Sequence, residues 1–484
     1  MRKIISILIL LSIFIPKDAL CLRPIAARYG SINMLPKERL ELIGAVEWLS
    51  NPPKTNYTSG AMFVSRYCNM RCAHCSPEVK LLPKEKKAKL PHLFISEKLA
   101  DDVIVFLNDA NIRELTVTGG GEPMVDIVSV KVLRMLIKQL RLDKPKKYAR
   151  PGPFARLFSM PTNNTLVIVS NGLWAKKRSR RAAVLKVMDK ALAKSDFDTV
   201  QFTFSVDEFH SPVALDGVAS LIAMHMETDG RILHNADVSI GLKIVNGNAA
   251  YNMERIRELI EKVRKKLKKK SKKSKEVLRV DIGRLENDLH GDAYKWLGYV
   301  SGNILLKYKR KKKSSKVLVK YGIIPFSNMS TDTTPDSELP AHLMQKAKQR
   351  VVGVARNGLQ TLIDTDGNAC LDCRNRLDSL AFVSGHVTEG FKIVSGREAR
   401  DPIFRAMREH GPSFVLDILR EIVPTVPFRR YANADPAYAL DEILMDEDLR
   451  MKLCFAILRD SKYAGTLYPE SQQKVDALEK AFNA

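Results

Sequence analysis

The chain has 484 residues, of which 45% are hydrophobic, and a formal net charge of +25. This length permits a large buried core and predicts one large domain followed by a smaller C-terminal one. An apolar run from Ile4 to Ile15 is too short to span a bilayer, which needs about 20 residues. The rest of the sequence contains no candidate transmembrane segment.

The N-terminal run has features of a targeting segment. Arg2 and Lys3 precede it and Pro16 ends it, as in the first two regions of a signal peptide. Lys17 and Asp18, however, interrupt the small-residue pattern expected at a cleavage site. We interpret residues 1–25 as a hydrophobic leader or signal-like segment.

Three cysteines form the most informative motif in the chain. Cys68, Cys72 and Cys75 have C-x3-C-x2-C spacing, in a sequence with seven cysteines. Three thiolates in so short a loop can bind three irons of a [4Fe-4S] cluster and leave the fourth iron open. Zinc with His74 as its fourth ligand is the alternative, but His74 adjoins Cys75 and the two can hardly reach one ion. The spacing therefore favours the iron–sulfur cluster over zinc.

Glycine-rich or polar motifs follow several predicted strands. The strand 112–118 leads into Gly-Gly-Gly-Glu-Pro at 119–123, and the strand at 166–169 leads into Ser-Asn-Gly at 170–172. The alternating stretch 200–206 leads into Asp-Glu-Phe-His at 207–210, and further strands are predicted at 238–245 and 277–282. Taken singly, each motif reads equally well as an ordinary strand-to-helix turn.

Helical patterns alternate with these strands. They are predicted at 96–108, 124–141, 175–194, 211–228 and 250–268. The alternation favours parallel βαβ units, so we expect an α/β fold, a partial (β/α)6 TIM-type barrel over residues 55–300. Its ligands would bind at the carboxyl ends of the strands, where every motif lies.

The order of these motifs resembles the radical S-adenosylmethionine (radical SAM) superfamily. The resemblance implies that the open iron chelates S-adenosylmethionine, which is reductively cleaved to a 5′-deoxyadenosyl radical that abstracts hydrogen from a substrate. It also implies positions that contact the cofactor. These are Gly120, Gly121 and Glu122 for the methionine amino group, Ser170 and Asn171 after the third strand, and Ser205 and Asp207 for the ribose and methionine parts. His210 is a candidate for facing the substrate.

The C-terminal third predicts a β-hairpin and then helices. Residues 355–392 contain two short strands around Asp366-Gly367 and close with Cys370-x2-Cys373. They resemble the SPASM or twitch extensions that follow many radical SAM barrels and often bind auxiliary iron–sulfur clusters. Cys370 and Cys373 are candidate ligands of an auxiliary metal, but a full auxiliary cluster needs ligands that the sequence does not offer, so a metal-free hairpin is favoured. Residues 402–484 are expected to form a mainly helical region in which Cys454 is buried.

Much of the positive charge lies in two lysine-rich segments. Residues 262–275 carry ten basic side chains and residues 307–316 carry seven, with no acid in either. We interpret both as solvated insertion loops around the sixth strand. Because only Tyr308 interrupts them with an aromatic ring, they favour weak anion binding over specific RNA binding.

These features together predict a radical SAM enzyme acting on a peptide or protein, with flavodoxin or ferredoxin as electron donor. The alternatives are an RNA-modifying radical SAM enzyme and a non-catalytic iron–sulfur or zinc-binding module. Glycine-rich and Ser-x-Asp motifs, which a pure metal-binding module does not need, discriminate against the last. An oxygen-sensitive cluster favours the cytoplasm, whereas the N-terminal segment favours membrane-surface contact or export.

Overall fold

The computed structural model describes most of the chain, with gaps. The residues described are 35–46, 57–70, 94–118, 121–142, 164–207, 210–245, 249–269, 277–290, 300–310, 313–324, 354–355, 358–371, 380–424, 436–459, 473, 475–477 and 479–480. The leader predicted at residues 1–25 lies outside them. Within the described residues, no helix is long and apolar enough to cross a membrane.

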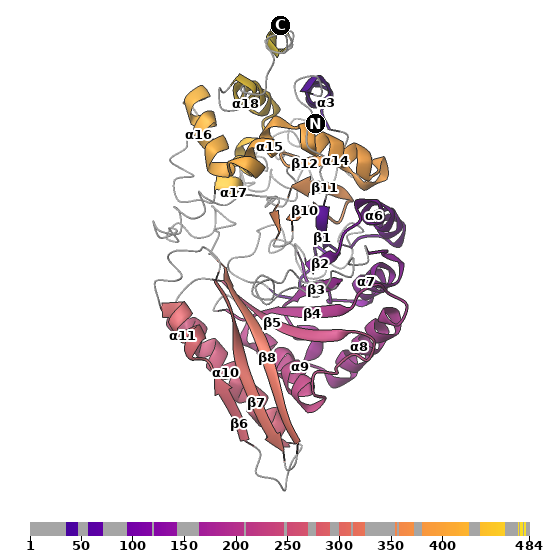
Figure 1. The fold of residues 1–484 in the computed structure, drawn as a ribbon, viewed down its shortest axis with the longest axis vertical. Helices are drawn as coiled ribbons and strands as arrows, with labels where there is room; N and C mark the ends of the chain where they lie inside the picture. The colour runs from indigo at the N-terminus through magenta and orange to yellow at the C-terminus, as the bar shows by residue number, and fades with distance from the viewer. Residues whose placement is uncertain are drawn as a thin grey trace, which may run out of the picture.

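One mixed sheet forms the centre of the molecule (Figure 1). Its strands run in the order β12-β11-β10-β1-β2-β3-β4-β5-β8-β7-β6, with β9 paired to β10. The strand bounds are β1 Tyr57–Phe63, β2 Glu114–Thr118, β3 Thr165–Ser170, β4 Thr199–Ser205, β5 Asp237–Val245, β6 Val277–Asp281, β7 Val300–Arg310, β8 Lys313–Ile324, β9 Val354–Ala355, β10 Gly358–Ile363, β11 Asn368–Leu371 and β12 Val383–His386. Strands β10, β1, β2, β3, β4, β5 and β8 are parallel to their neighbours in this order. The described strands form an open sheet, so the predicted α/β fold with a partial barrel is confirmed.

Helices follow the parallel strands as the hydrophobic periodicity predicts. The first set comprises α3 Lys37–Val46, α6 Glu97–Ala110, α7 Ile127–Gln139, α8 Arg178–Leu192, α9 Leu215–Glu227, α10 Ala249–Lys269 and α11 Gly283–His290. Local sequence fixes their starts: the Ser96 side chain caps α6 through the Leu99 amide, and Asp126 caps α7 through the Ser129 amide. The five helices predicted between strands are all present.

The alternating pattern of β4 shows how the sheet divides its two faces. Val200, Phe202 and Phe204 are fully buried, whereas Gln201 and Thr203 are half-buried. Successive side chains of a strand point to opposite faces, so the apolar set packs on one side and the polar set lines the other. The sheet thus has an apolar face under the helices and a polar, partly open face.

The predicted sixth barrel strand is in a different place. Residues 277–281 form β6, which pairs antiparallel with β7 at the end of the strand order, while β8 takes the position beside β5. The antiparallel pair β7–β8 continues the sheet as a long extension (Figure 1). The prediction of six sequential parallel strands was therefore wrong at the sixth, because β7 and β8 were not predicted and residues 307–316, which include parts of both, were interpreted as a loop.

The two lysine-rich segments are largely regular structure. Residues 262–269 are the last two turns of α10, and residues 307–310 and 313–316 belong to β7 and β8. The interpretation of these segments as insertion loops was wrong for the described residues. The methylene stems of Lys and Arg can cover apolar surface while the charged ends stay in water. A lysine-rich sequence can therefore form a regular helix or strand.

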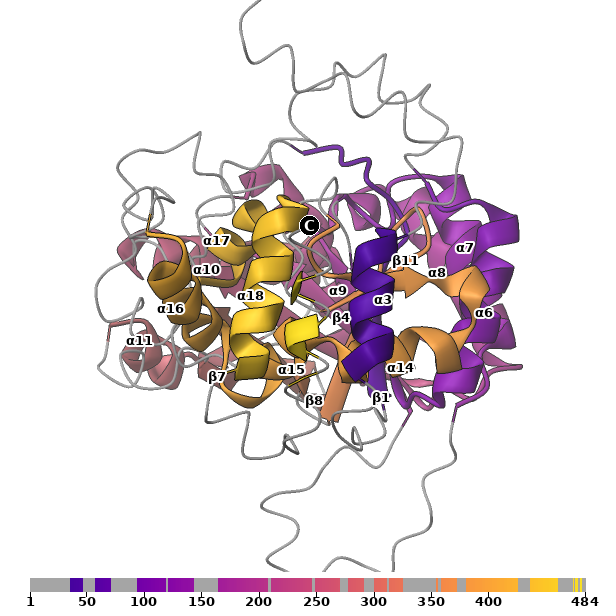
Figure 2. The ribbon, with the colours of Figure 1, turned by 90° about the horizontal axis from the view of Figure 1, so that it is seen from above.

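The C-terminal hairpin extends the same sheet. Strand β10 pairs in parallel with β1, and β11 and β12 continue outward antiparallel. A layer of helices covers this end, and Figure 2 shows α3 beside α14 there. The helices of this layer are α14 Phe391–Arg400, α15 Pro402–Glu409, α16 Pro412–Ile422, α17 Pro436–Ile443 and α18 Glu447–Arg459. Helices α15, α16, α17 and α18 share a separate apolar core that includes the buried Cys454, as predicted, whereas Val394 of α14 belongs to the main core.

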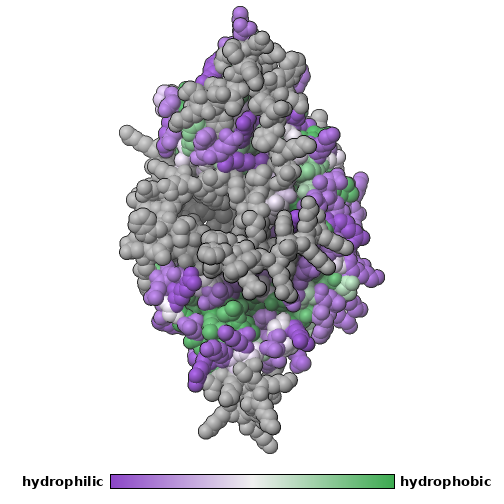
Figure 3. Space-filling model, viewed as in Figure 1, coloured by the Kyte–Doolittle hydropathy of each residue, from purple (hydrophilic) through white to green (hydrophobic). Residues whose placement is uncertain are grey.

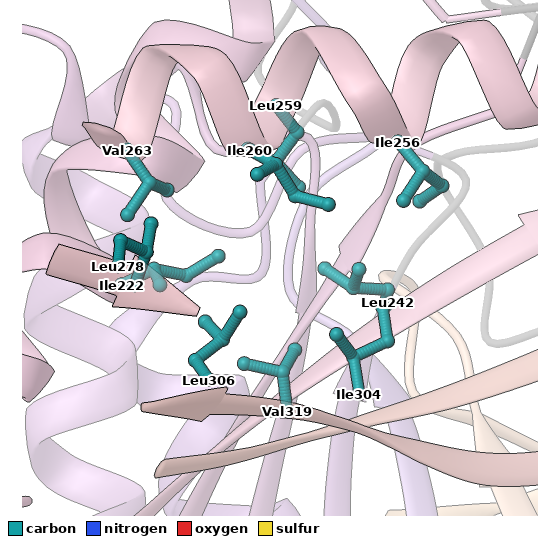
Figure 4. A pocket seen from close by; sticks show the side chains of 10 residues that line it. All are labelled: Ile222, Leu242, Ile256, Leu259, Ile260, Val263, Leu278, Ile304, Leu306 and Val319. Atoms are coloured by element: carbon teal, nitrogen blue, oxygen red, sulfur yellow. The ribbon is translucent and has the colours of Figure 1, made fainter. Parts of the chain in front are cut away.

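An apolar layer lies between α10 and the sheet. Side chains from α9, α10, β5, β6, β7 and β8 converge there around a cavity of about 10 Å³, as Figure 4 shows. A cavity of that size holds about one water at most, and its lining is entirely aliphatic. It is a packing defect of the core and offers no polar group for recognition or chemistry.

Candidate functional site

The predicted motifs gather at the carboxyl ends of β1 to β4. Residues 65–70 follow β1, Gly121 and Glu122 follow β2, Asn171 follows β3 and Asp207 follows β4. Because these four strands are parallel neighbours, their ends form one edge of the sheet. Ligand sites of open α/β sheets lie at this edge.

The cysteine loop and the glycine-rich loop are joined through their backbones. The Glu122 amide donates a 2.8 Å hydrogen bond to the Tyr67 carbonyl oxygen. A Cβ atom at Gly121 would lie 2.4 Å from the same oxygen and 2.6 Å from the Arg66 carbonyl carbon. The approach of two main chains therefore explains why position 121 requires glycine.

The Glu122 carboxylate joins the loop after β2 to the end of β3. It is 2% exposed and accepts hydrogen bonds from the Ser170 hydroxyl at 2.8 Å, the Asn171 amide at 2.7 Å and the Met124 amide at 3.1 Å. Burial raises the pKa of the Glu122 carboxyl, while the bonds from Asn171, Ser170 and Met124 act in the opposite direction. The observed role of this side chain is thus to hold two motif loops together.

Asn171 connects that joint to the cysteine loop. Its side-chain amide donates to Asn69 Oδ1 at 2.8 Å and lies 3.9 Å from Cys68 Sγ. The Met70 backbone amide is 3.4 Å from the same sulfur. Hydrogen bonds from amides to sulfur stabilise a thiolate and tune a bound cluster. The surroundings of Cys68 therefore fit a metal-ligating thiolate.

Ser170 and Gly172 fix the turn after β3. The Ser170 hydroxyl accepts hydrogen bonds from the Gly172 amide and the Trp174 indole, both at 3.0 Å. Gly172 has φ of +79°, a left-handed conformation that favours glycine. The Ser-Asn-Gly motif is therefore a rigid turn that presents the Asn171 side chain to the cysteine loop.

The Ser-x-Asp motif lies on the next strand. Ser205 is half-buried on the polar face, in register with Lys243 of β5. Asp207 is 1% exposed, and its Oδ1 lies 2.6 Å from His210 Nδ1. The structure thus brings His210 to Asp207. Its predicted position facing a substrate stays a prediction, as do the contacts of Ser205 and Asp207 with a ribose.

Several predicted residues lie outside the described part of the chain. They are Cys72, His74, Cys75, Gly120 and Cys373. Two of the three cysteines are therefore not described. Among the residues that are described, no three His, Cys, Asp or Glu side chains lie together as possible metal ligands. The ligand set of the predicted cluster remains a prediction from the sequence.

The hairpin cysteine Cys370 is a packing residue. It is fully buried in β11, within a small apolar cluster that includes Leu362 and Val383. Its thiol lies 3.5 Å from the Asn368 carbonyl oxygen. The auxiliary metal suggested for Cys370 and Cys373 gains no support from these surroundings and stays a prediction.

Two contacts at the site were missed from the sequence. Arg66, two residues before Cys68, pairs with Asp366 in the turn between β10 and β11, at 2.5 Å between Nη2 and Oδ2. Arg180 of α8 donates to the Met124 carbonyl oxygen at 3.0 Å and so braces the glycine-rich loop. Neither arginine belongs to a local motif, and each partner is more than 50 residues away. Only the tertiary structure could reveal them.

Comparison with known proteins agrees with the predicted cluster. Residues 59–150 match the family model described as "4Fe-4S single cluster domain". No curated protein matches the chain. Eight chains of solved structures are similar to it, including one described as "Native anSMEcpe with bound AdoMet". That structure has 10% sequence identity and a TM-score of 0.35, over 87% of this chain and 100% of the other. Similarity at this score carries no argument by itself.

The fold and the family match define the class of the site. The residues that match the 4Fe-4S single-cluster model begin within β1 of the open α/β sheet and include the cysteine loop, α6, β2 and α7. The match confirms the [4Fe-4S] prediction made from the cysteine spacing and supports the resemblance to the radical SAM superfamily. The match to a 4Fe-4S model also disfavours zinc, the alternative metal for this cysteine loop.

Proposed function

We propose that this chain is a radical SAM enzyme that holds its [4Fe-4S] cluster on Cys68, Cys72 and Cys75. The observation that carries the proposal is the hydrogen-bonded joint between three motif loops at one edge of the sheet. Asn171 reaches Cys68 and Asn69 from one side, and its backbone amide donates to Glu122 from the other. A simple metal-binding loop needs none of this support.

The chain's own residues give this joint two tasks. The buried carboxylate of Glu122 fixes the ends of β2 and β3 relative to each other, and Asn171 fixes the cysteine loop to both. A site held by such supporting bonds keeps its geometry when a cofactor binds. S-adenosylmethionine bound at the cluster would supply the 5′-deoxyadenosyl radical as hydrogen abstractor.

The cofactor contacts we propose follow from the sequence motifs. Gly120 and Gly121 offer backbone groups after β2, and Ser205 and Asp207 offer polar groups after β4. Glu122 and Ser170 are placed to act through the loops they hold. The substrate we propose is a peptide or protein, supported by the C-terminal extension that joins the sheet beside β1. A small redox protein such as flavodoxin or ferredoxin would supply the electron.

Cluster assembly in matched cysteine variants tests the ligand set. Anaerobic reconstitution with iron and sulfide is expected to give a cluster in the wild type and to fail in Cys72→Ala. Cys454→Ala is the matched control, because this thiol is buried in the separate C-terminal core, where burial raises its pKa to about 12. A full iron content in Cys72→Ala would move the cluster to other ligands.

The response of the cluster to S-adenosylmethionine separates an enzyme from a non-catalytic module. We expect the electron paramagnetic resonance spectrum of the reduced cluster to change when S-adenosylmethionine is added. Adenosine, which lacks the methionine amino and carboxylate groups, should leave it unchanged. An intact reduced cluster with the same spectrum in the presence of either compound would contradict the proposal.

A further inference from the structure

The sheet extension formed by β6, β7 and β8 carries a row of three cations on one face. The antiparallel register places Arg279 opposite Lys307, and Lys307 opposite Lys316. All three side chains are exposed. We call the row, together with the neighbouring Leu305 and Leu318, the cationic face.

The opposite face of the extension is covered. Leu306 and Val319 alternate with the cationic face along their strands and line the apolar layer under α10 (Figure 4). Tyr308 and Tyr321 point to this covered side and are 5% and 2% exposed. Because successive side chains point to opposite faces of a sheet, the cationic face is the other side of the extension. No described helix or strand covers it.

The row is unfavourable by itself. Like charges directly opposite each other on neighbouring strands destabilise a sheet. Within the described part of the chain, Arg279, Lys307 and Lys316 form no ion pair with an acid. The acid in the adjoining row, Asp281, has its Oδ1 3.4 Å from the Gly283 amide. Lysines on an edge strand discourage aggregation, but here the cations continue inward over β7 and β8.

The adjoining row has Asp281 on β6 and two leucines on β7 and β8. Leu305 pairs with Leu318, two residues along each strand from the cationic row, and Leu318 is 52% exposed. Figure 3 shows hydrophobic colour over β7 and β8 bordered by hydrophilic colour. Two residues of a strand span about 7 Å, which is also the spacing of alternate side chains in any extended peptide. The step from one row to the other thus matches an acid followed two residues later by an apolar side chain.

We propose that the cationic face docks an extended acidic segment of a peptide or protein. An acid would lie over the row of Arg279, Lys307 and Lys316, and an apolar side chain two residues away would cover Leu305 and Leu318. A single-stranded nucleic acid fits this face less well. Such ligands bind through aromatic side chains that stack on bases, and both tyrosines of β7 and β8 are on the covered side.

The cationic face is continuous with the candidate site along β8. Lys316 and Gly322 are six residues apart, about 20 Å along the strand. Gly322 pairs with Lys243, which pairs with Ser205 at the carboxyl end of β4. A segment docked on the cationic face can therefore extend to the candidate site. That this segment belongs to the substrate rests on the proposed function, whereas the docking itself does not.

Binding to the full chain tests the docking without any redox chemistry. The probe is a fluorescein-labelled twelve-residue peptide of the repeat Glu-Ser-Leu-Ser, followed by fluorescence anisotropy at low salt. The variant is Lys307→Glu/Lys316→Glu. The matched control, Lys186→Glu/Lys190→Glu, makes the same charge change on exposed positions of α8. We expect a loss of affinity of about tenfold or more in the first and less than about twofold in the second.

Further probes decide between partner classes. A Lys-Ser-Leu-Ser peptide should not bind, and a Glu-Ser-Ser-Ser peptide should bind more weakly than the Glu-Ser-Leu-Ser probe because it leaves the leucines uncovered. Equal losses in both double variants, or tighter binding of a twelve-nucleotide uridine RNA than of the acidic peptide, would overturn the proposal. The measurement needs no cluster, so its failure would leave the proposed enzyme activity standing.

Discussion

Substitution of Glu122 tests the joint between the glycine-rich loop and β3. Glu122→Ala would leave three donors without their acceptor, from Ser170, Asn171 and Met124, in a site that is 2% exposed. An unsatisfied buried donor costs about 1–3 kcal/mol, part of which water entering the cavity recovers. We expect a loss of about 3–5 kcal/mol in the free energy of unfolding.

Glu122→Gln keeps the shape and separates geometry from charge. One amide oxygen can still accept from Ser170, but the new NH2 group faces the Asn171 amide, which is also a donor. We expect a smaller loss of about 1–3 kcal/mol. Chemical denaturation followed by circular dichroism measures both variants. A loss below about 0.5 kcal/mol for Glu122→Ala, the size typical of a surface substitution, would refute the buried joint.

The pH dependence of the stability of the wild type and of Glu122→Gln gives a second check. Burial raises the pKa of the Glu122 carboxyl, so its favourable contribution is complete below the unfolded pKa and is lost as the pH rises through the folded pKa. Gln does not titrate. The stability difference between wild type and Glu122→Gln should therefore shrink as the pH rises above about 4.5. A difference that grows over this range would mean that the hydrogen bonds outweigh burial.

Three further changes test other parts of the account. Gly121→Ala should lower stability by about 1–3 kcal/mol and reduce iron uptake, because its Cβ meets a main-chain oxygen at 2.4 Å. Gly283→Ala should do neither, because its Cβ comes no closer than 3.9 Å to Asp281 Oδ1. Arg66→Ala and Asp366→Asn should reduce iron uptake to a similar extent, because the two side chains form one ion pair beside the cysteine loop. A reduced iron uptake in Arg66→Ala alone would exclude the ion pair as the cause. Burial lowers the pKa of His225, so its neutral form favours folding and the protein loses stability as the pH falls below about 6.5. His225→Gln should lose less stability over this range, and an acid denaturation equal to that of the wild type would contradict this.

The parallel part of the fold was predictable because its signals are local. Alternation in β4 and 3.6-residue periodicity in α6 and α9 give the element types directly. The place of each motif after its strand then follows from βαβ connectivity. The sixth strand failed because residues 300–324 combine lysine-rich sequence with long antiparallel strands. In both strands apolar residues alternate with lysines, and the high lysine content hides the period of two that would indicate a strand.

The site was predictable in its residue types and less so in its contacts. Gly121 was predicted as a cofactor contact, whereas the structure explains its glycine by the close approach of the main chain of the cysteine loop. The engagement of Glu122 with β3 did not follow, because an acid in that motif reads as a cofactor contact. Its partners Ser170 and Asn171 are almost 50 residues away. Likewise, only the pairing of β1 with β10 brings Asp366 to Arg66, and no local pattern encodes that pairing.

The central claim is that this site uses its cluster to cleave S-adenosylmethionine. The most direct measurement is the amount of 5′-deoxyadenosine formed by the anaerobically reconstituted full chain with S-adenosylmethionine and dithionite. We expect 5′-deoxyadenosine with the wild type and with Cys454→Ala, and none with Cys72→Ala. An intact, reduced cluster that forms no 5′-deoxyadenosine would contradict it.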